Sequence, residues 1–510
     1  MNKIVVRRTH IDIYDYDLGD NRSLEASLSV WDKTTHRLIP KGYVYDMENR
    51  VLMIPRGVSI HKLEMSFNTQ AEVDYSFDQY RTFYQEVSLK YKPRSEDQIE
   101  AIKFILAMDK YKENERKSML SLNLNTGKGK TYCAIASMAY LGIASIIISP
   151  TLDLLDQWNR FILEYTDINP DKIYKISGSP SIQKLLSRDP ATYDIFLCSH
   201  ATLNSYGNTY GWENVGALFK YLGIGLKYYD ECHLNFENML LIDSYTNTFM
   251  SYYLTATMGR SNFSEDIIFQ TYFSNVPSIN LFNKEEDPHT RYVAIKYNSK
   301  PSPLDIEYCK NNYGLDRMKY PGYVVDQPNF ENLLYILMEK ALAKPGKCLW
   351  YIGTNEGILR VKNWIYEHYP EMIGNVGVFT SLVTDPEIKA QQLERKIILS
   401  TTKSAGAAID IKDLVETVNL AEPFKSRVLA QQTLGRTRNN NTIYKDIVDL
   451  GFDQTRKFYN FKRPIFKKYA TDCSEVILRQ EELDSRAQAI KDERKNLWCP
   501  IQFMDKCNIE

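Results

Sequence analysis

Residues Leu124–Thr131 have the types and spacing of a loop that binds phosphate groups. Their sequence, Leu-Asn-Thr-Gly-Lys-Gly-Lys-Thr, lies between an apolar run that predicts a strand and an apolar stretch that predicts a helix. Small residues here let backbone N–H groups converge on phosphate oxygens at a helix N-terminus. Lys130 would reach the β- and γ-phosphates of a nucleotide, and Thr131 would hold Mg²⁺. A chance turn rich in glycine and lysine is the weaker reading. The expected nucleotide site comprises Thr126, Gly127, Lys128, Gly129, Lys130 and Thr131.

Two adjacent carboxylates, Asp230 and Glu231, follow a second apolar run at 224–229. Asp230 can hold a magnesium ion through its water shell, and Glu231 can orient and deprotonate an attacking water. An acidic turn after a buried strand explains the same residues, but this reading weakens beside the upstream phosphate loop. The pattern predicts hydrolysis of a nucleotide, with Lys130 as the third catalytic group.

Alternating strands and helices must position these residues. From about residue 89, short apolar runs alternate with helical stretches, which is typical of parallel sheets covered on both faces. The alternation weakens between about 259 and 290, as in a linker, and then resumes. The sequence therefore predicts an α/β fold with two tandem parallel-sheet domains. The apolar runs lie at 120–124, 143–148, 195–198, 224–229, 292–295, 348–352, 376–379, 397–399, 415–420 and 447–450.

The two ends of the chain differ from this pattern. Residues 43–45 and 51–54 predict a β-hairpin, and they belong to a β-rich segment without a phosphate loop. Residues 474–496 are charged and helix-prone. We expect four parts: a small β-containing accessory domain at 1–88, a first α/β domain at 89–285, a second at 286–470, and a charged helical tail at 471–510.

Composition excludes several classes of protein. The 510 residues include 63 basic and 64 acidic side chains, so a histone-like protein or a polybasic arm is excluded, whereas a local basic groove is not. No apolar run approaches the roughly 18 residues of a membrane span, and the first residues lack a signal peptide. Eight scattered cysteines without a Cys-x-x-Cys pair predict reduced thiols in a cytoplasm and no zinc site.

The box Asp-Glu-Cys-His at 230–233, downstream of the phosphate loop, resembles that of superfamily 2 helicases. Further segments resemble the motifs of this family in their order, from about residue 91 to residue 470. They are Pro93-Arg94 with Gln98, Ser149-Pro150-Thr151 with Leu155 and Gln157-Trp158, Ser199–Leu203, Leu254–Thr257, Thr402–Ile411 and Gln432–Arg438.

This resemblance implies a role for each matching residue. In the family, the arginine fingers in the last motif reach a nucleotide held by the first domain, and guanidinium groups suit that task because they stay charged and bind phosphate bidentately. Here they are Arg436 and Arg438. The residues expected at the nucleotide are Gln98, Gly406 and Asp410; those at the nucleic-acid backbone are Pro150, Thr151, Ser199, Thr202 and Thr402; those that couple hydrolysis to movement are His233, Thr255, Thr257 and Gln432.

The resemblance also implies a fold and an activity. It implies two RecA-like domains and an ATP-dependent motor that uses ATP with Mg²⁺ and holds single-stranded or branched DNA independently of sequence. The box, the Gln157-Trp158 pair and the N-terminal segment look most like phage UvsW-type helicases and their restriction-translocase and repair-helicase relatives. These act on forks, recombination intermediates or R-loops in replication, recombination or repair, so a phage origin, a host cytoplasm and replication or recombination proteins as partners are expected.

Other readings stay open. An RNA helicase is disfavoured because the box is not Asp-Glu-Ala-Asp. A nucleic-acid-stimulated ATPase that translocates without separating strands is the alternative from another class, and a catalytically inactive scaffold is disfavoured by the intact Lys130, Glu231 and Arg436. Residues 455–469 combine basic and aromatic side chains, which suits single-strand binding. We favour an amphipathic helix with its aromatic residues in the core.

Overall fold

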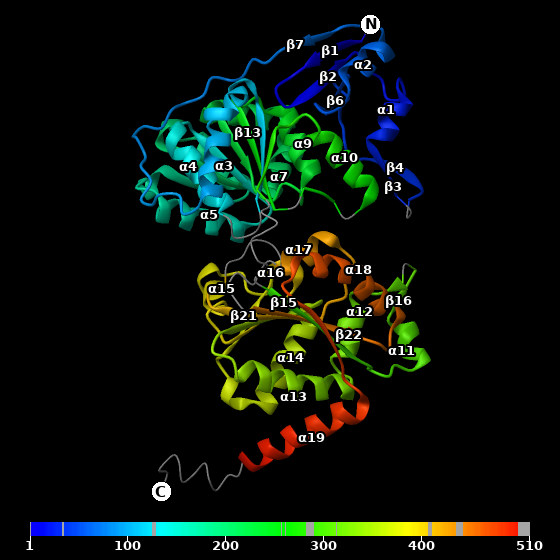
Figure 1. Ribbon diagram of the computed structural model, residues 1–510. Coiled ribbons are helices and arrows are strands. Elements are labelled where there is room, and N and C mark those ends of the chain that lie inside the picture. Colours follow the sequence, from blue (N-terminus) through cyan, green and yellow to red (C-terminus); the bar gives the residue numbers. More distant parts are fainter. Residues whose placement is uncertain are drawn as a thin grey trace. The chain divides into compact units, whose positions relative to one another are not determined.

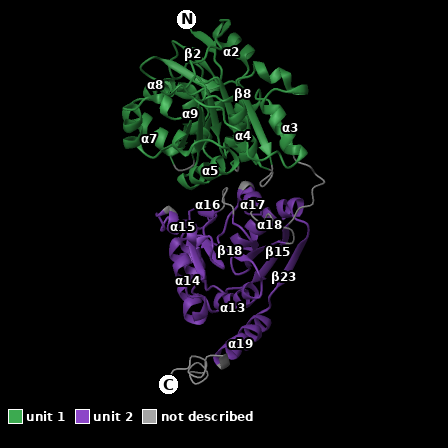
Figure 2. Ribbon diagram, turned by 90° about the vertical axis from the view of Figure 1, so that its left-hand side faces the viewer, with its two compact units in different colours: residues 1–283 green, residues 284–510 purple. Residues whose placement is uncertain are grey.

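The chain folds into two compact units, residues 1–283 and 284–510 (Figure 2). The computed structural model describes residues 2–32, 35–124, 129–256, 258–260, 262–281, 290–312, 314–405, 411–434 and 442–497. Each unit contains a parallel sheet, and the first unit also contains a small N-terminal mixed sheet (Figure 1). Among the described helices, none is both long and apolar enough to cross a bilayer.

The N-terminal sheet has the strand order β5-β6-β2-β1-β7. Neighbouring strands of this sheet pair antiparallel, except that β1 and β7 pair parallel. The predicted hairpin at 43–54 is confirmed, because β5 and β6 pair with Val44 opposite Met53. The elements are β1 (Lys3–Val6), β2 (His10–Tyr14), α1 (Arg22–Ser27), β3 (Ser29–Asp32), β4 (Arg37–Pro40), β5 (Val44–Asp46), β6 (Val51–Pro55), α2 (Ile60–Phe67) and β7 (Ala71–Val73).

The large sheet of unit 1 has the order β10-β11-β9-β12-β13-β8-β14 in the described part of the chain, and every pairing is parallel. Its central strands are buried along their whole length, which explains their continuous apolar runs. The strands are β8 (Met119–Leu124), β9 (Ser145–Ser149), β10 (Ile173–Ile176), β11 (Ile195–Ser199), β12 (Leu226–Tyr229), β13 (Met250–Thr255) and β14 (Ser278–Leu281).

Helices lie on both sides of this sheet (Figure 1). One core contains residues of α3, α4 and α5, and the other contains residues of α6 to α10. The helices are α3 (Glu96–Ile105), η1 (Asp109–Arg116), α4 (Lys130–Leu141), α5 (Leu152–Tyr165), η2 (Pro170–Lys172), α6 (Ser179–Leu186), η3 (Pro190–Thr192), α7 (His200–Tyr210), α8 (Trp212–Leu222), α9 (Phe236–Tyr245) and α10 (Phe263–Phe273).

The N-terminal sheet shares the second of these cores. Ile4, Ile11 and Leu52 belong to the same buried cluster as Ile268 of α10. The contact is close, because a Cβ atom on Gly57 would lie 1.6 Å from the carbonyl oxygen of Thr271. The linker expected at 259–290 is therefore corrected for its described part. That segment contains α10, which packs on the N-terminal sheet, and β14, which pairs with β8.

Unit 2 contains a second parallel sheet, with the described order β19-β20-β18-β21-β22-β15-β23. When the strands of each large sheet are numbered along the chain, both sheets have the order 3-4-2-5-6-1-7, so the two large sheets repeat one topology. The strands are β15 (Thr290–Tyr297), β18 (Lys347–Ile352), β19 (Val376–Phe379), β20 (Ile397–Ser400), β21 (Leu414–Ala421), β22 (Thr442–Asp449) and β23 (Cys473–Ile477), beside a small pair, β16 (Lys310–Asn311) and β17 (Gly314–Leu315).

The helices of unit 2 bear on two predictions. Phe458, Tyr459 and Phe466 of α18 are buried, as the amphipathic reading expects. The helix expected over 474–496 begins only at Gln480, because Cys473–Ile477 form β23 at the sheet edge. The helices are α11 (Pro303–Tyr308), α12 (Lys319–Val324), α13 (Pro328–Leu342), α14 (Asn355–His368), η4 (Pro370–Met372), α15 (Pro386–Gln392), α16 (Thr402–Ala405), α17 (Arg427–Leu434), α18 (Asp453–Tyr469) and α19 (Gln480–Leu497).

The predicted fold class is confirmed. The described residues form two tandem α/β units with parallel sheets, together with a small N-terminal part that contains strands.

Candidate functional site

The predicted catalytic residues of unit 1 lie at one edge of its sheet. β9, β12, β13 and β8 are neighbours in the sheet and run parallel, so their carboxyl ends meet at the same edge. Lys130 begins α4 after β8, Asp230 and Glu231 follow β12, and Thr255 ends β13. Ligands of open parallel sheets bind outside this edge.

Lys130 and Glu231 are in direct contact. The Nζ atom of Lys130 lies 3.3 Å from Oε1 of Glu231, and both side chains are about nine-tenths buried, with 11% and 10% exposed. Removal of a charge from water is costly unless it is paired, so each group supplies the counter-charge that the other needs in this buried position. The lysine of the expected phosphate loop thus lies against the acidic box, a contact that was not predicted from the sequence.

The acidic turn after β12 is held in a strained conformation. Glu231 has φ of +46°, in the left-handed region that residues with a Cβ rarely adopt. The Asp230 N–H donates to the carbonyl of Ile148 at 2.9 Å, and the Cys232 N–H donates to the carbonyl of Leu254 at 3.1 Å. Backbone strain of this kind costs about 1–3 kcal/mol and persists only where the surroundings enforce it. The turn is therefore fixed from β9 on one side and β13 on the other.

Asp230 has the chemistry of a cation ligand. The indole N–H of Trp158 donates to its Oδ2 at 2.9 Å, and the Glu231 N–H donates to its Oδ1 at 3.1 Å. Burial, followed by the neighbouring Glu231 carboxylate, raises the pKa of Asp230 to about 6. A divalent cation would offset both effects, and carboxylate and hydroxyl oxygens are the ligands that Mg²⁺ takes. Asp230 and Thr131 therefore fit the magnesium that the nucleotide brings.

His233 links the acidic turn to the end of β13. Its Nδ1 lies 2.8 Å from Oγ1 of Thr255 and 3.4 Å from Oε2 of Glu231. Burial lowers the pKa of His233 to about 4, so the ring is neutral at physiological pH. A guanidinium N–H of Arg260 donates to the carbonyl of His233. Two of the four predicted coupling residues, His233 and Thr255, are thus brought together.

Gln98 lies against the last glycine of the phosphate loop. Gly129 has φ of +87°, and a Cβ there would lie 2.2 Å from Nε2 of Gln98. Gln98 is buried on α3, and its Oε1 accepts the N–H of Arg94 at 2.9 Å. The positive φ therefore favours glycine at 129, and the missing Cβ leaves room for the Gln98 amide.

The residues of unit 1 that are predicted to contact the nucleic-acid backbone also lie at the carboxyl ends of the strands. Thr151, which follows Pro150 and β9, caps α5, because its Oγ1 accepts the N–H of Leu154 at 3.4 Å. Ser199 caps α7, and its Oγ lies 3.0 Å from Oγ1 of Thr202. Sequence reasoning missed these capping roles, although serine and threonine just before a helix are their usual signal.

In unit 2, the predicted contact residue Thr402 is buried and bound to Glu422. The N–H of Thr402 donates to Oε2 of Glu422 at 2.6 Å, and its hydroxyl donates to Oε1. Burial raises the pKa of Glu422. Gln432 is buried on α17. Glu422 itself was missed, and its only signal is an acidic residue directly after the apolar run of β21.

Trp158 was assigned to a segment that touches nucleic acid, and the structure instead joins its indole to Asp230. Its burial on the apolar face of α5 is the signal for this inward role. Eight predicted site residues lie outside the described residues: Thr126, Gly127, Lys128, Thr257, Gly406, Asp410, Arg436 and Arg438.

Two curated proteins are similar to the chain, and part of it matches a family profile. Residues 90–260 match the family described as the type III restriction enzyme, res subunit. The chain is 22% identical over 366 residues to transcript termination protein A18 of Yaba-like disease virus, which covers 65% of this chain and 67% of that protein. It is 33% identical over 85 residues to DNA 3'-5' translocase XPB2 of Sulfurisphaera tokodaii, covering 15% of this chain and 19% of that protein. The chain thus matches about a fifth of the second relative.

Two solved structures are similar as well. The Dbp5 protein of S. cerevisiae, bound to RNA and ADP BeF3, has 13% identity and a TM-score of 0.51, over 78% of this chain and 97% of that one. T4 UvsW has 15% identity and a TM-score of 0.35, over 94% and 100%. The Dbp5 likeness concerns the fold, which it shows to be the tandem RecA-like arrangement. The family match thus covers residues 90–260. With the two relatives, it makes the chain similar to superfamily 2 helicases, with the activity of an ATP-dependent helicase or translocase.

Proposed function

We propose that the chain remodels branched DNA, such as forks, recombination intermediates or R-loops, by ATP-driven movement along one strand. The observation that carries the ATP-driven part of the proposal is the contact of Lys130 with Glu231 beside Asp230, in a turn fixed by two neighbouring strands. A DNA translocase among the relatives supports DNA as the substrate. The Asp-Glu-Cys-His box and the N-terminal module support a role in repair or recombination.

In this proposal, each residue at the sheet edge of unit 1 has one task. Lys130 leaves Glu231 when ATP binds and contacts the β- and γ-phosphates, while Thr131 and Asp230 hold the metal. Bound Mg²⁺ supplies charge neutralisation for the transferred phosphoryl group. Glu231 is then free to take the proton of the attacking water. Arg436 and Arg438 stabilise the transition state, an effect worth about 10³- to 10⁵-fold in related phosphoryl transfers.

Movement depends on groups that connect the nucleotide to the nucleic acid. His233 bonds Thr255, so a shift of Glu231 during hydrolysis is passed to the end of β13. The remaining proposed coupling residues are Thr257 and Gln432. The proposed backbone contacts are Pro150, Thr151, Ser199, Thr202 and Thr402, and the proposed nucleotide contacts are Gln98, Thr126, Gly127, Lys128, Gly129, Gly406 and Asp410. Backbone contacts carry no sequence information, so binding is expected to be sequence-tolerant and salt-sensitive.

We propose a division of labour among four parts of the chain. Residues 89–285 bind and hydrolyse ATP, residues 286–470 supply the arginine fingers, residues 1–88 add contacts to nucleic acid, and residues 471–510 form an appended tail. A cytoplasmic location and partners in replication or recombination belong to the same proposal.

The test is the ATPase rate of the full chain alone and with single-stranded DNA, duplex DNA, a four-way junction or RNA. We expect the strongest stimulation by branched or single-stranded DNA. Lys130→Ala, which removes the main positive partner of the γ-phosphate, should abolish turnover in every arm. Stimulation by RNA alone would contradict the proposal and identify an RNA helicase. Stimulation by DNA whose strands are not separated would identify a translocating ATPase.

A further inference from the structure

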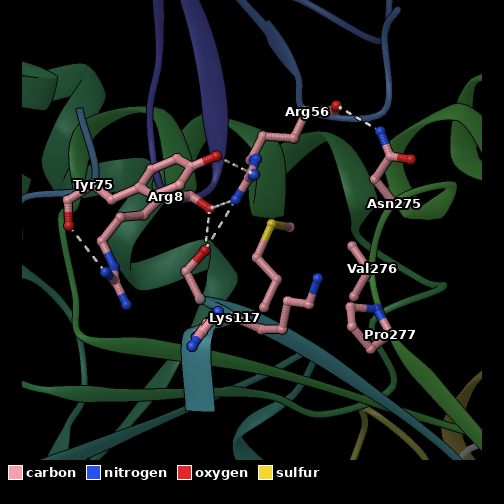
Figure 3. A pocket seen from close by; sticks show the side chains of 10 residues that line it. Arg8, Arg56, Tyr75, Lys117, Asn275, Val276 and Pro277 are labelled. Atoms are coloured by element: carbon pink, nitrogen blue, oxygen red, sulfur yellow. Dashed lines mark hydrogen bonds between the residues drawn. The ribbon is translucent and has the colours of Figure 1, made fainter. Parts of the chain in front are cut away.

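Unit 1 contains a pocket of about 150 Å³ far from the predicted nucleotide site. It lies where turns of the N-terminal sheet meet the segments that lead into β8 and β14 (Figure 3). Its wall includes Arg8, Arg56, Tyr75, Arg116, Lys117 and Asn275. Four of these side chains are cationic, and none of the lining residues is acidic.

The two inner arginines are held by neutral acceptors. Arg8 donates to the carbonyls of Tyr75 and Phe249, and its guanidinium carbon lies 4.9 Å from the ring centre of Phe77. Arg56 donates to the carbonyl of Arg8 at 2.9 Å and to the hydroxyl of Tyr75 at 2.9 Å. These bonds fix the geometry and leave the positive charges uncompensated. Burial, followed by the nearby Arg56, lowers the pKa of Arg8.

The two outer cations complete the charge imbalance. Arg116 and Lys117 are exposed at the end of η1, and no ion pair joins either of them to a carboxylate in the described part of the chain. Like charges gathered without counter-charges favour an anion, and arginine forks bind phosphate oxygens bidentately. The pocket therefore matches a phosphate group.

The phosphate is not that of the hydrolysed nucleotide. The pocket contains Met119, the first residue of β8, whereas the phosphate loop follows Leu124 at its last residue. A strand rises about 3.3 Å per residue, so the two sites are roughly 15–20 Å apart, at the amino and carboxyl ends of the strands. Thr151, Ser199 and Thr202 also lie at the far edge.

Aromatic side chains beside the pocket favour nucleic acid over a small phosphate compound. Tyr75 and Phe77 each have 42% of their surface exposed. Exposed rings next to cations are suited to a strand whose bases stack while its phosphates are bound. The pocket is also assembled before any ligand arrives, because the amide of Asn275 donates to the carbonyl of Arg56 at 3.2 Å.

We propose that this pocket binds a backbone phosphate of a DNA segment other than the one contacted at the carboxyl edge of the sheet. The inference rests on the proposed function and deepens it, because it gives the motor a second anchoring point. A second anchor on the opposite edge suits a branched substrate, which presents more than one arm.

The test compares salt dependence of binding for a four-way DNA junction. The variant Arg116→Gln/Lys117→Gln removes the two exposed cations and leaves the packed arginines in place. A matched control, Lys112→Gln/Lys220→Gln, removes two exposed charges of unit 1 outside the pocket. Because the slope of log K against log salt changes by about 0.9 for each duplex phosphate contact, the pocket variant should lose about one unit of slope. Its ATPase rate without nucleic acid should equal that of the wild type.

Two results would overturn the proposal. One is a slope equal to that of the control variant. The other is binding of inorganic pyrophosphate that the pocket variant loses while its junction binding is unchanged, which would identify a small phosphate ligand. Failure of the proposed function is distinguishable, because then the wild type itself would show no stimulation of its ATPase by any DNA.

Discussion

The two large sheets share one topology but place their polar groups differently. After β8, the first strand of the large sheet in unit 1, Gly129 and Lys130 open a helix, and Lys130 has a carboxylate partner that a phosphate can replace. After the first strand of unit 2, the N–H and hydroxyl of Ser299 donate to Asp449 at 3.0 and 2.6 Å. The two donors of Ser299 are thus already satisfied by a carboxylate.

The fifth strands differ in the same way. In unit 1, the residues after β12 are Asp230 and Glu231. Asp230 accepts the indole N–H of Trp158, and Glu231 pairs with Lys130, whose contact a phosphate can replace. In unit 2, the residue after β21 is Glu422, and both of its oxygens bind Thr402. In the proposed function, this position serves catalysis in unit 1, whereas in unit 2 its carboxylate binds Thr402. Topology supplies the place, and the partners of the carboxylate decide its task.

The largest expected effect tests this comparison directly. Glu231→Gln should lower ATP turnover by about 10²- to 10⁴-fold, the usual contribution of a general base, while ATP affinity is retained. Glu422→Gln, at the equivalent place in unit 2, should affect turnover far less and weaken nucleic-acid binding through Thr402. Turnover numbers and ATP dissociation constants of both variants measure the contrast. If the Glu231→Gln variant lost ATP affinity in step with turnover, Glu231 would have a structural role and would not be the general base.

A second variant probes the charges inside the sheet of unit 2. The carboxylate of Glu416 is fully buried, contacts Lys344, and lies 2.6 Å from Nζ of Lys445. Glu416→Ala would leave both lysines without their counter-charge, and we expect a loss of about 3–5 kcal/mol in the free energy of unfolding of unit 2. Urea denaturation measures this. The exposed pair of Glu356 and Arg360 is the control, since Glu356→Ala should cost at most about 1 kcal/mol.

A third variant concerns the packing of the N-terminal sheet, which unit 2 lacks. Gly57→Ala would place a methyl group against the backbone of Thr271, so we expect a destabilisation of about 1–3 kcal/mol. Thermal unfolding should show a lowered midpoint for unit 1. Gly322→Ala in α12 is the matched control, because a Cβ at Gly322 meets no atom within 4 Å. Equal midpoints for the two variants would contradict the close packing.

The smallest expected effect lies at Asp230. In the proposed function, ionised Asp230 is the form that holds the metal. Its pKa in the free protein is raised to about 6, so kcat/KM for ATP should fall as the pH drops through 6. Trp158→Phe removes a hydrogen bond to the ionised form. The acidic limb of the pH profile should therefore move upward by about one unit. The control is Trp212→Phe. The indole of Trp212 donates to Asn208, so this variant should leave the acidic limb of the pH profile unchanged.

Prediction from sequence succeeds where a pattern is local. The runs at 120–124 and 143–148 became β8 and β9 because a buried parallel strand needs a continuous apolar run. Lys130 and Glu231 could be assigned to one site because both follow such strands, and parallel strands bring their carboxyl ends together.

The misses depend on contacts between distant segments. The polar residues of 259–290 read as a linker, since nothing local shows that Ile268 and Phe269 pack on the N-terminal sheet. Glu475 and its charged neighbours favour a helix, but pairing with β15 makes the segment a strand. The inward role of Trp158 likewise depends on Asp230, which lies 72 residues further along the chain.

The shared core of the N-terminal sheet and α10 also sets an order of events during synthesis. Gly57 leaves the ribosome 214 residues before Thr271, its neighbour in the folded chain. At a synthesis rate of about 5–20 residues per second, roughly 10–40 s pass between the synthesis of Gly57 and that of Thr271. During that interval Ile4, Ile11 and Leu52 lack part of their covering. The strands of the N-terminal sheet are thus translated before α10, and the core that they share with it is completed only when most of unit 1 has emerged.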